Sequence, residues 1–291
     1  MEWLNAVIQG VLLGGLYALL ATGLSLVFGV MRMVNLAHGD LGMLAAFAAV
    51  ALVGATGMGA LPSLLLVVPL MVVLGYVLQR GLLNFTLSAG PLPPLLGTFG
   101  LAVVLQNGLL TVFSADSRGL DAGPIENTSL TITDQLAVGW LPLLTLAVAI
   151  AILVGLQLLL NHTRLGRAVR ASSDDGEAAQ MVGIDNRHIY GVAMAIALGT
   201  VAIGGVFLGI KTTFGPLDGP ARLIFAFESV IIGGLGSLWG TLVGGIILGV
   251  AQGIGNQINP AYQIVAGHLV FLTILLLRPS GLFSRPGVRE A

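Results

Sequence analysis

Long, continuous apolar runs constrain the fold of this chain more than any other feature of its sequence. A helix of about twenty apolar residues, rising about 1.5 Å per residue, spans the roughly 30 Å hydrocarbon core of a membrane. The runs do not alternate polar and apolar residues, which argues against membrane strands. We therefore predict an all-α fold, a polytopic transmembrane helical bundle forming one domain over residues 1–291. About eight apolar segments are expected: 6–30, 38–55, 61–79, 93–113, 138–160, 189–210, 223–253 and 258–277.

The composition excludes several classes of protein. Charged residues make up 9% of the 291 residues, too few for the surface of a soluble domain. The net charge is −1 with no basic block, so no nucleic-acid partner is expected. There is no cysteine, and we predict no metal site and no cofactor. The N-terminal run lacks a basic n-region and is too long for a signal peptide, so we interpret it as the first membrane helix.

The arginines predict how the chain is oriented in the membrane, because cytoplasmic loops are enriched in basic residues. The 161–188 segment carries four of them and is placed in the cytoplasm: Arg164, Arg167, Arg170 and Arg187. Counting back through five helices places the acidic 114–137 loop and the N-terminus on the periplasmic side. The 278–291 tail, which contains Arg278, Arg285 and Arg289, is predicted to be cytoplasmic.

The second half of the chain has one crossing too many for this orientation, and its glycines suggest how that conflict is resolved. The 223–253 segment contains IIGGLGSLWG, with four glycines in eight residues: Gly233, Gly234, Gly236 and Gly240. We predict that this run breaks the segment into a re-entrant or discontinuous pair of helices. Such breaks are tolerated at membrane depth where they are buried in protein or line a polar cavity.

A similar break is predicted in the first half, where polar residues separate two apolar runs: Arg32, Asn35, His38 and Asp40. Asp40 is interpreted as the N-cap of the following helix in preference to a substrate ligand, and Arg32 as an anchor on the inner side. Asn35 either caps a helix or lines a path. Both breaks contain G-x-L-G-x-L, at 39–44 and 233–238, which is either a trace of an internal repeat or a chance match.

Other polar residues within the apolar runs have two interpretations each. Glu228 is either functional, as intramembrane acids usually are, or paired with Arg222 or Lys211. Interhelical hydrogen bonds are expected from Tyr17, Gln106 and Asn107, and His268 is interpreted as a packing residue. Seven residues are candidates for a translocation path: Asn35, His38, Asp40, Glu228, Gly233, Gly234 and Gly236.

Small residues recur at every fourth position in three segments, which places them on one face of each helix. The series are Gly10, Gly14, Ala18 and Thr22, then Gly205 and Gly209, then Gly245, Gly249 and Gly253. They favour a tightly packed bundle, with a membrane partner, over ordinary lipid-helix composition.

The 161–188 segment is the most informative about function, because nothing in the chain resembles an enzyme site. The single lysine, Lys211, follows Ile210 where a nucleotide-binding loop requires glycine, so the chain is not expected to hydrolyse ATP. Ser172 or Ser173 is predicted to cap a short helix that Gly183 ends. Ala178, Ala179, Met181 and Val182 give this helix an apolar side, so the segment is either a helix that docks on a soluble partner or an ordinary charged loop.

Glu177, Ala178 and Ala179, followed after three residues by Gly183, resemble the EAA-x3-G coupling motif of ABC importer permeases, although the later I-x-L-P part is absent. TRLGRAVRA, VNLAHGDLGML, GGLGSLWG and LRPSGLF extend the likeness over about residues 8–284. The chain thereby resembles the branched-chain amino-acid ABC transporter permease family of the LivH type.

This resemblance implies a multi-pass permease subunit in a bacterial inner membrane, with no catalytic residues of its own. It implies four partners: a second related permease, two cytoplasmic ABC ATPases and a periplasmic substrate-binding protein. The 172–184 helix would couple to an ATPase through six residues: Glu177, Ala178, Ala179, Gly183, Arg167 and Arg170. Alternatives are a urea or short-chain amide permease and, from another class, a channel or ion-coupled carrier that works alone. A channel needs no docking helix, and a carrier should show more intramembrane acids.

Overall fold

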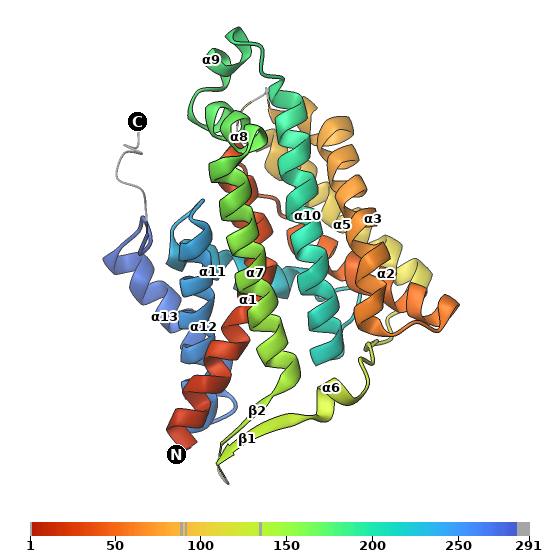
Figure 1. Cartoon of the computed structure of the whole chain (residues 1–291), viewed down its shortest axis with the longest axis vertical. Helices are drawn as coiled ribbons and strands as arrows, with labels where there is room; N and C mark the ends of the chain where they lie inside the picture. Colours follow the sequence, from red (N-terminus) through yellow and green to blue (C-terminus); the bar gives the residue numbers. More distant parts are fainter. Residues whose placement is uncertain (1, 88–89, 91, 134–135, 284–291) are drawn as a thin grey trace.

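The computed structural model describes the chain except residues 1, 88–89, 91, 134–135 and 284–291 (Figure 1). Within the described residues, 7 helical segments are long and apolar enough to cross a membrane. The predicted all-α, polytopic bundle is therefore confirmed. The segments are α1 (Glu2–Met31), α2 (His38–Thr56), α3 (Ala60–Leu78) continuing through a π-helical turn (Gln79–Leu83) into α4 (Asn84–Leu87), α5 (Leu92–Phe113), α7 (Trp140–His162), α10 (Asn186–Lys211) and α12 (Leu238–Ile258).

Shorter elements complete the fold. Two further helices are α11 (Gly219–Gly233) and the apolar α13 (Tyr262–Leu277). The remaining elements are α6 (Pro124–Asn127), β1 (Ser129–Thr133), β2 (Leu136–Gly139), α8 (Arg164–Asp174) and α9 (Gly176–Met181). The two strands form an antiparallel hairpin in which Val138 pairs with Leu130 and Gly139 with Ser129. Because those two residues belong to the hairpin, the fifth span begins at Trp140 and not at the predicted residue 138.

Helices α1 and α10 form the centre of the bundle, and most of their apolar residues are buried inside the chain. The α1 face that carries the small residues packs on α12 so closely that a side chain would not fit. A Cβ atom on Gly10 would lie 2.6 Å from the Cα of Val250, and one on Gly245 would lie 2.8 Å from the carbonyl oxygen of Gly14. The predicted close packing is therefore confirmed, and this pair of helices forms the frame for the rest.

The contacts between α1 and α12 also show which segments share an end of the bundle. At one end Gln257 donates a hydrogen bond of 3.2 Å to Glu2. At the other end Gly236 packs on Gly29, and the backbone N–H of Phe283 donates to Gly233 at 3.1 Å. Helix α8 also lies at this second end, because Val169 packs with Leu26 and Val30 of α1 (Figure 1). The 161–188 segment and the described part of the tail thus lie at the same end, whereas Arg285 and Arg289 lie outside the described residues.

The 223–253 segment is divided as its glycines suggested, with α11 ending at Gly233 and α12 beginning at Leu238. Gly234 and Gly236 make the turn at φ values of 100° and 79°, which L side chains rarely adopt. The matching G-x-L-G-x-L letters do not mark equivalent structures, however. Residues 39–44 are continuous helix within α2, whereas residues 233–238 form the turn itself, so placing both motifs at a helix break was wrong.

Candidate functional site

Two helices begin inside the bundle, and their N-termini meet at Asp40. Beyond Met31 the chain leaves α1 and turns inward, so that Nε2 of His38 lies 2.8 Å from the carbonyl oxygen of Leu20, in the middle of α1. Helix α11 begins at Gly219, and a Cβ atom on Gly219 would overlap the Asp40 carboxylate. The partial positive charges of both helix N-termini are therefore directed at one buried acid.

The Asp40 carboxylate is the most unusual polar group in this region. The residue is 1% exposed, and its Oδ1 accepts a hydrogen bond of 3.0 Å from Nε2 of Gln106 on α5. Its Oδ2 has no hydrogen-bond partner among the described residues. A buried carboxylate is costly unless it is compensated, and each helix N-terminus supplies about half a positive charge. The prediction that Asp40 is an N-cap was wrong, because α2 begins at His38 and Ala37 holds the cap position.

Asn35 and His38 are buried beside Asp40 and share its isolation from solvent, with exposed fractions of 0% and 1%. Oδ1 of Asn35 accepts from the backbone N–H of Ala37 at 3.0 Å, so Asn35 stabilises the turn before α2. Nδ1 of His38 has no partner in the part of the chain that the structure describes. Three of the predicted path residues are therefore brought together, but none of them faces open solvent here.

Glu228 lies in a second polar cluster, formed by α1, α11, α12 and α13. Its Oε1 is 2.5 Å from Nδ1 of His268, so its partner is neither Arg222 nor Lys211. Interpreting His268 as a packing residue was therefore wrong. The ring of Phe225 stacks with the rings of both His268 and Tyr17, at centroid distances of 6.1 and 5.3 Å.

The interhelical hydrogen bonds expected from three residues are found for two of them. Tyr17 donates to Oε1 of Gln252 on α12 at 2.6 Å, and Gln106 donates to Asp40. Asn107 instead donates to the carbonyl oxygen of Val103 within α5 at 2.8 Å, so that expectation was wrong.

The glycines of the turn between α11 and α12 are separate from Asp40. Gly233 packs against the backbone of Gly240, and Gly236 packs against Gly29 at the end of α1. Gly234 lies against Gly281, where a Cβ atom would come within 2.5 Å of it. These glycines allow backbones to touch, and the structure does not bring them to the polar residues at the start of α2.

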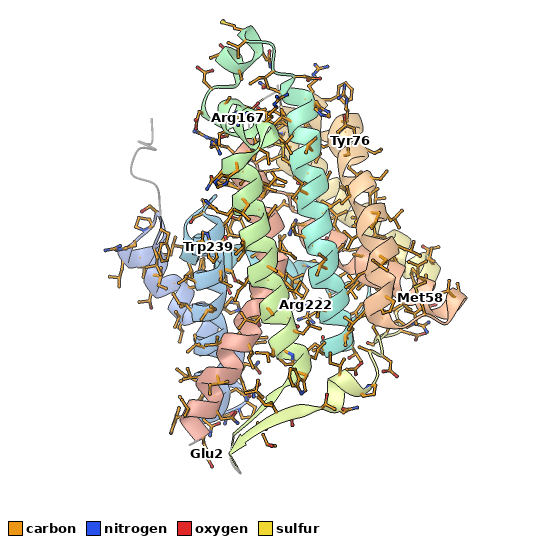
Figure 2. The ribbon with its side chains drawn as sticks, in the orientation of Figure 1. Glu2, Met58, Tyr76, Arg167, Arg222 and Trp239 are labelled. Atoms are coloured by element: carbon orange, nitrogen blue, oxygen red, sulfur yellow. The ribbon has the colours of Figure 1, made fainter. Side chains whose placement is uncertain are left out.

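The 161–188 segment forms two short helices at the end of the bundle where Arg167 lies (Figure 2). Helix α9 is capped by Asp175, whose Oδ1 accepts from the backbone N–H groups of Glu177 and Ala178, each at 3.0 Å. The prediction of a serine cap was wrong, because Ser172 donates to Oδ1 of Asn186 at 2.9 Å instead.

Gly183 has a φ of 88° just beyond α9, and the N–H of Ile184 donates back to Ala179 at 3.0 Å, as in a Schellman ending. Gly183 therefore ends the helix as the sequence predicted. The apolar side chains of α9 divide between two directions. Ala179 is 3% exposed and faces the bundle, whereas Met181 and Val182 are 86% and 77% exposed. An apolar pair this exposed at the tip of a helix is a surface suited to contact with another protein.

The other coupling candidates differ in their surroundings. Arg170 donates to the carbonyl oxygen of Leu160 and so ties α8 to the end of α7, while Arg167 is exposed. A cavity of about 580 Å³ is lined by residues of α9 and by the ends of α1 and α4. Three acidic residues, Asp174, Asp175 and Glu177, line it together with Arg187.

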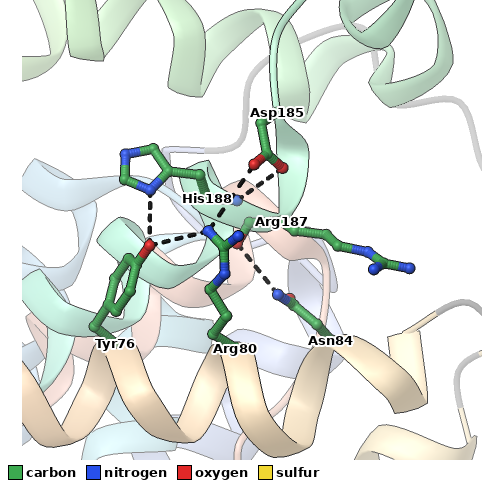
Figure 3. A network of polar contacts seen from close by, with 6 residues as sticks. All are labelled: Tyr76, Arg80, Asn84, Asp185, Arg187 and His188. Carbon is green, nitrogen blue, oxygen red and sulfur yellow. Dashed lines mark hydrogen bonds and ion pairs between the residues drawn. The ribbon is translucent and has the colours of Figure 1, made fainter.

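A network of polar contacts that the sequence did not suggest joins α3 to the start of α10 (Figure 3). The Tyr76 hydroxyl lies 2.9 Å from Nδ1 of His188 and accepts from Arg80 at 3.0 Å. Arg80 also faces Asp185 at 3.9 Å, and Asp185 caps α10. The end of the 161–188 segment is therefore attached to the spanning segment that contains Tyr76 and Arg80.

The chain is similar to known proteins over nearly its whole length. The family described as "Branched-chain amino acid transport system / permease component" matches residues 6–277. The permease protein BraD of Pseudomonas aeruginosa, a high-affinity branched-chain amino acid transport system protein, is 28% identical over 99% of this chain and 98% of its own length. The corresponding protein LivH of Escherichia coli is 27% identical over 100% of this chain and 98% of its own length.

Two more distant likenesses were found. The ribose import permease protein RbsC of Haemophilus influenzae is 26% identical over 72% of this chain and 67% of its own length. The solved structure of PsaBC from Streptococcus pneumoniae in complex with Fab covers 95% of this chain and 92% of that chain, at 14% identity and a TM-score of 0.48. The structural similarity to PsaBC is too weak to carry an argument about function.

Proposed function

This chain belongs to the branched-chain amino acid transport permease family, and we propose that it imports branched-chain amino acids as one half of a translocation path. The family consists of non-catalytic membrane subunits of ABC importers and includes sugar permeases as relatives. The chain is a multi-pass membrane protein. The other half of the path would come from a second related permease, and the energy from two cytoplasmic ABC ATPases. A periplasmic binding protein would deliver the amino acid.

The observation that carries this proposal is the combination of the full-length family match with the exposed tip of α9. Met181 and Val182 would enter a groove on an ATPase, with Glu177 and Ala178 beside them. Ala179 and Gly183 would keep α9 folded and in place, Arg170 would tie α8 to α7, and Arg167 would face the ATPase. The end of the bundle with α8 and α9 would then be cytoplasmic, the 278–291 tail would share that side, and the N-terminus and the 114–137 loop would be periplasmic.

The proposed path for a zwitterionic amino acid uses the two buried polar regions. Hydrocarbon does not accept the ammonium and carboxylate of the substrate, so they need polar groups on the way. Oδ2 of Asp40 is available to an ammonium group, and Glu228 offers a second carboxylate. Asn35 and His38 would hold the start of α2 in shape, and the turn at Gly233, Gly234 and Gly236 would let α11 and α12 move as a pair. The burial of Asp40 implies that α2 and α11 must separate for cargo to reach it.

The test is uptake by the complete transporter in vesicles. The chain, its second permease and its ATPases would be reconstituted with the binding protein outside the vesicles, and labelled leucine, urea and acetamide would be compared with and without ATP inside. We expect ATP-dependent uptake of leucine. Uptake of urea or acetamide in place of leucine would establish the alternative substrate class, and leucine uptake by the single chain without ATPases would refute the proposed mechanism.

Orientation has its own test, because the chain contains no cysteine and single probes are therefore specific. We would introduce Met181→Cys in one variant and Asp121→Cys in another, and label intact and opened cells with a membrane-impermeant maleimide. Asp121→Cys should react in intact cells whose periplasm is accessible, and Met181→Cys only after the inner membrane is opened. The reverse pattern would overturn the proposed orientation and would place α9 out of reach of an ATPase.

A further inference from the structure

We infer that the outer face of α13, with His268 at its edge, is the surface on which the second permease chain packs. This inference rests on the proposed function, since it names the face by which the chain meets that subunit. The face consists of a stripe of apolar residues spaced three or four apart, with His268 beside it: Val265, Leu269, Leu272 and Leu276.

Helix α13 is bound to its own chain by a narrow contact. Gly267 is the one buried residue among Tyr262–Leu277, and a Cβ atom there would lie 3.0 Å from Nε2 of Gln252. The apolar members of the outer face are between 48% and 84% exposed. Most of the helix surface therefore points away from the bundle, toward lipid or toward another chain.

His268 decides between lipid and another chain. Its Nδ1 is engaged by Glu228 at 2.5 Å, while the side chain remains 40% exposed and its Nε2 makes no hydrogen bond within the described chain. The neighbouring Gly267 packs on Gln252, which bonds Tyr17 near the middle of the 30-residue α1, so His268 lies at hydrocarbon depth. Lipid tails offer no hydrogen-bond partner at this depth, and polar groups there face protein or a water-filled cavity.

Two other outward faces differ from this one. The outer side of α3 is apolar along its length, with Leu66, Leu70 and Val73 all at least half exposed. That face can meet lipid without leaving a hydrogen-bonding group unpaired. The outer side of α5 carries Asn107, which donates to the Val103 carbonyl of its own helix and makes no contact with an ionisable group comparable to that of His268 with Glu228.

The occupant we assign is a spanning helix of a second permease of this family, carrying a hydroxyl, amide or carboxylate opposite Nε2 of His268. Such a contact combines an apolar stripe with one interhelical hydrogen bond, the kind of polar link that helps specify pairing between membrane helices. Because Glu228 engages Nδ1 of His268, Nε2 is the nitrogen that faces outward, and the ring is held in one orientation.

Crosslinking in the assembled transporter tests the contact. A benzophenone amino acid would be placed at Leu269 in one preparation and at Val73 of α3 in a matched control, followed by ultraviolet light and peptide mass spectrometry of the purified complex. We expect Leu269 to crosslink to a spanning peptide of a second permease and Val73 to give lipid adducts only. Permease crosslinks at Val73 and not at Leu269 would overturn the assignment, as would crosslinks from Leu269 to lipid alone.

A second measurement addresses His268 itself. His268→Phe keeps an aromatic ring against Phe225 and removes both nitrogens, while Thr273→Val is the control, because the Thr273 hydroxyl donates to Leu269 within α13. We expect His268→Phe to lower the fraction of permease pairs that survive size-exclusion chromatography and Thr273→Val to leave it unchanged. Equal survival in both variants would refute the role of His268.

These readouts do not depend on transport. A permease crosslink at Leu269 in a transporter that fails to import leucine would support this interface and overturn the proposed substrate. Leucine import by a transporter in which Leu269 meets only lipid would do the opposite, since the proposed function would stand and the interface would not.

Discussion

The two breaks in the spanning helices solve the same geometrical problem with different chemistry. The break before α2 leads into a group of polar side chains, Asn35, His38 and Asp40, that are buried to 1% exposure or less. Asp40 lies in the first turn of α2, against the start of α11. The break between α11 and α12 is made of glycine, and its residues touch other backbones at Gly29, Gly240 and Gly281. One break concentrates charge and hydrogen-bonding groups, and the other removes side chains so that segments can approach.

This difference in chemistry suits the two breaks to different roles: ligand binding at the start of α2, and joining of two helices at the turn between α11 and α12. A buried carboxylate with a free oxygen is expensive to keep, and retaining one at two helix N-termini is a feature of functional positions within membranes. A glycine turn has no chemistry to offer a ligand, and its effect on function comes through the positions of α11 and α12. Substitutions should therefore damage folding at the second break and transport at the first.

The largest effect is expected from Gly233→Val. A side chain at this position would overlap the backbone of Gly240, and the two helix ends could not close. We expect a loss of about 3 kcal/mol or more of stability, seen as aggregation or a strongly lowered melting temperature in detergent. Gly108→Val is the control, since no atom lies within 4 Å of a Cβ there, and it should fold normally. A Gly233→Val protein that melts with the parent would contradict the close packing.

Asp40 should show the opposite balance between stability and transport. Asp40→Asn keeps a hydrogen-bond acceptor for Gln106 but removes the charge that two helix N-termini stabilise. We expect a loss of about 1–2 kcal/mol in stability and complete loss of ATP-dependent uptake. Thermal melting and vesicle uptake measure the two effects. Gln106→Leu, which leaves the charge in place, is the comparison and should retain partial uptake. Normal uptake by Asp40→Asn would exclude a role for the charge.

The Gly183→Leu substitution tests whether an exposed glycine turn tolerates a side chain. The φ of Gly183 is 88°, but no atom lies within 4 Å of a Cβ, so the penalty for Gly183→Leu is conformational strain of about 1 kcal/mol, confined to the end of α9. Membrane insertion and melting should match those of the parent while ATP-coupled uptake is abolished, because the tip of α9 is displaced. Glu177→Lys should behave alike. Full uptake in either variant would remove the coupling role of α9.

The smallest effect is expected in the polar network at the start of α10. The Arg80–Asp185 pair is 3.9 Å apart with both side chains about half exposed, so it contributes little to stability, about 0.5 kcal/mol at most. Arg80→Ala should leave melting nearly unchanged and lower the uptake rate modestly. Lys at the same position retains the charge and serves as the matched control. A large drop in melting temperature would show that the network supports the fold itself.

The sequence located the spans well and the polar contacts poorly, and the reason lies in how far each signal extends along the chain. Hydropathy is a property of about twenty consecutive residues, so the apolar segments were predicted within a few positions. Gly183 could be identified as a helix end because its conformation depends on its immediate neighbours. The cap of α9 was misassigned because Ser172 is used by Asn186, which is fourteen residues away.

The missed partners share one property, which is that each contact joins residues far apart in sequence. His268 and Glu228 are separated by 40 residues, and Gln252 and Tyr17 by 235. No local pattern distinguishes a paired membrane histidine from a packing one. Glu228 was correctly marked as unusual, because any intramembrane acid is costly, but its partner could be found only from the packing of α13 on α11.

By itself the sequence determined that this protein is a bundle of membrane helices with two breaks, since hydrocarbon requires continuous apolar helix and glycine and polar clusters interrupt it. Only the tertiary structure decided what the breaks do. It placed the start of α11 against Asp40, and it closed the glycine turn on itself at Gly233 and Gly240. The stability of a buried charge depends on everything packed around it, and that surrounding is assembled from distant parts of the chain.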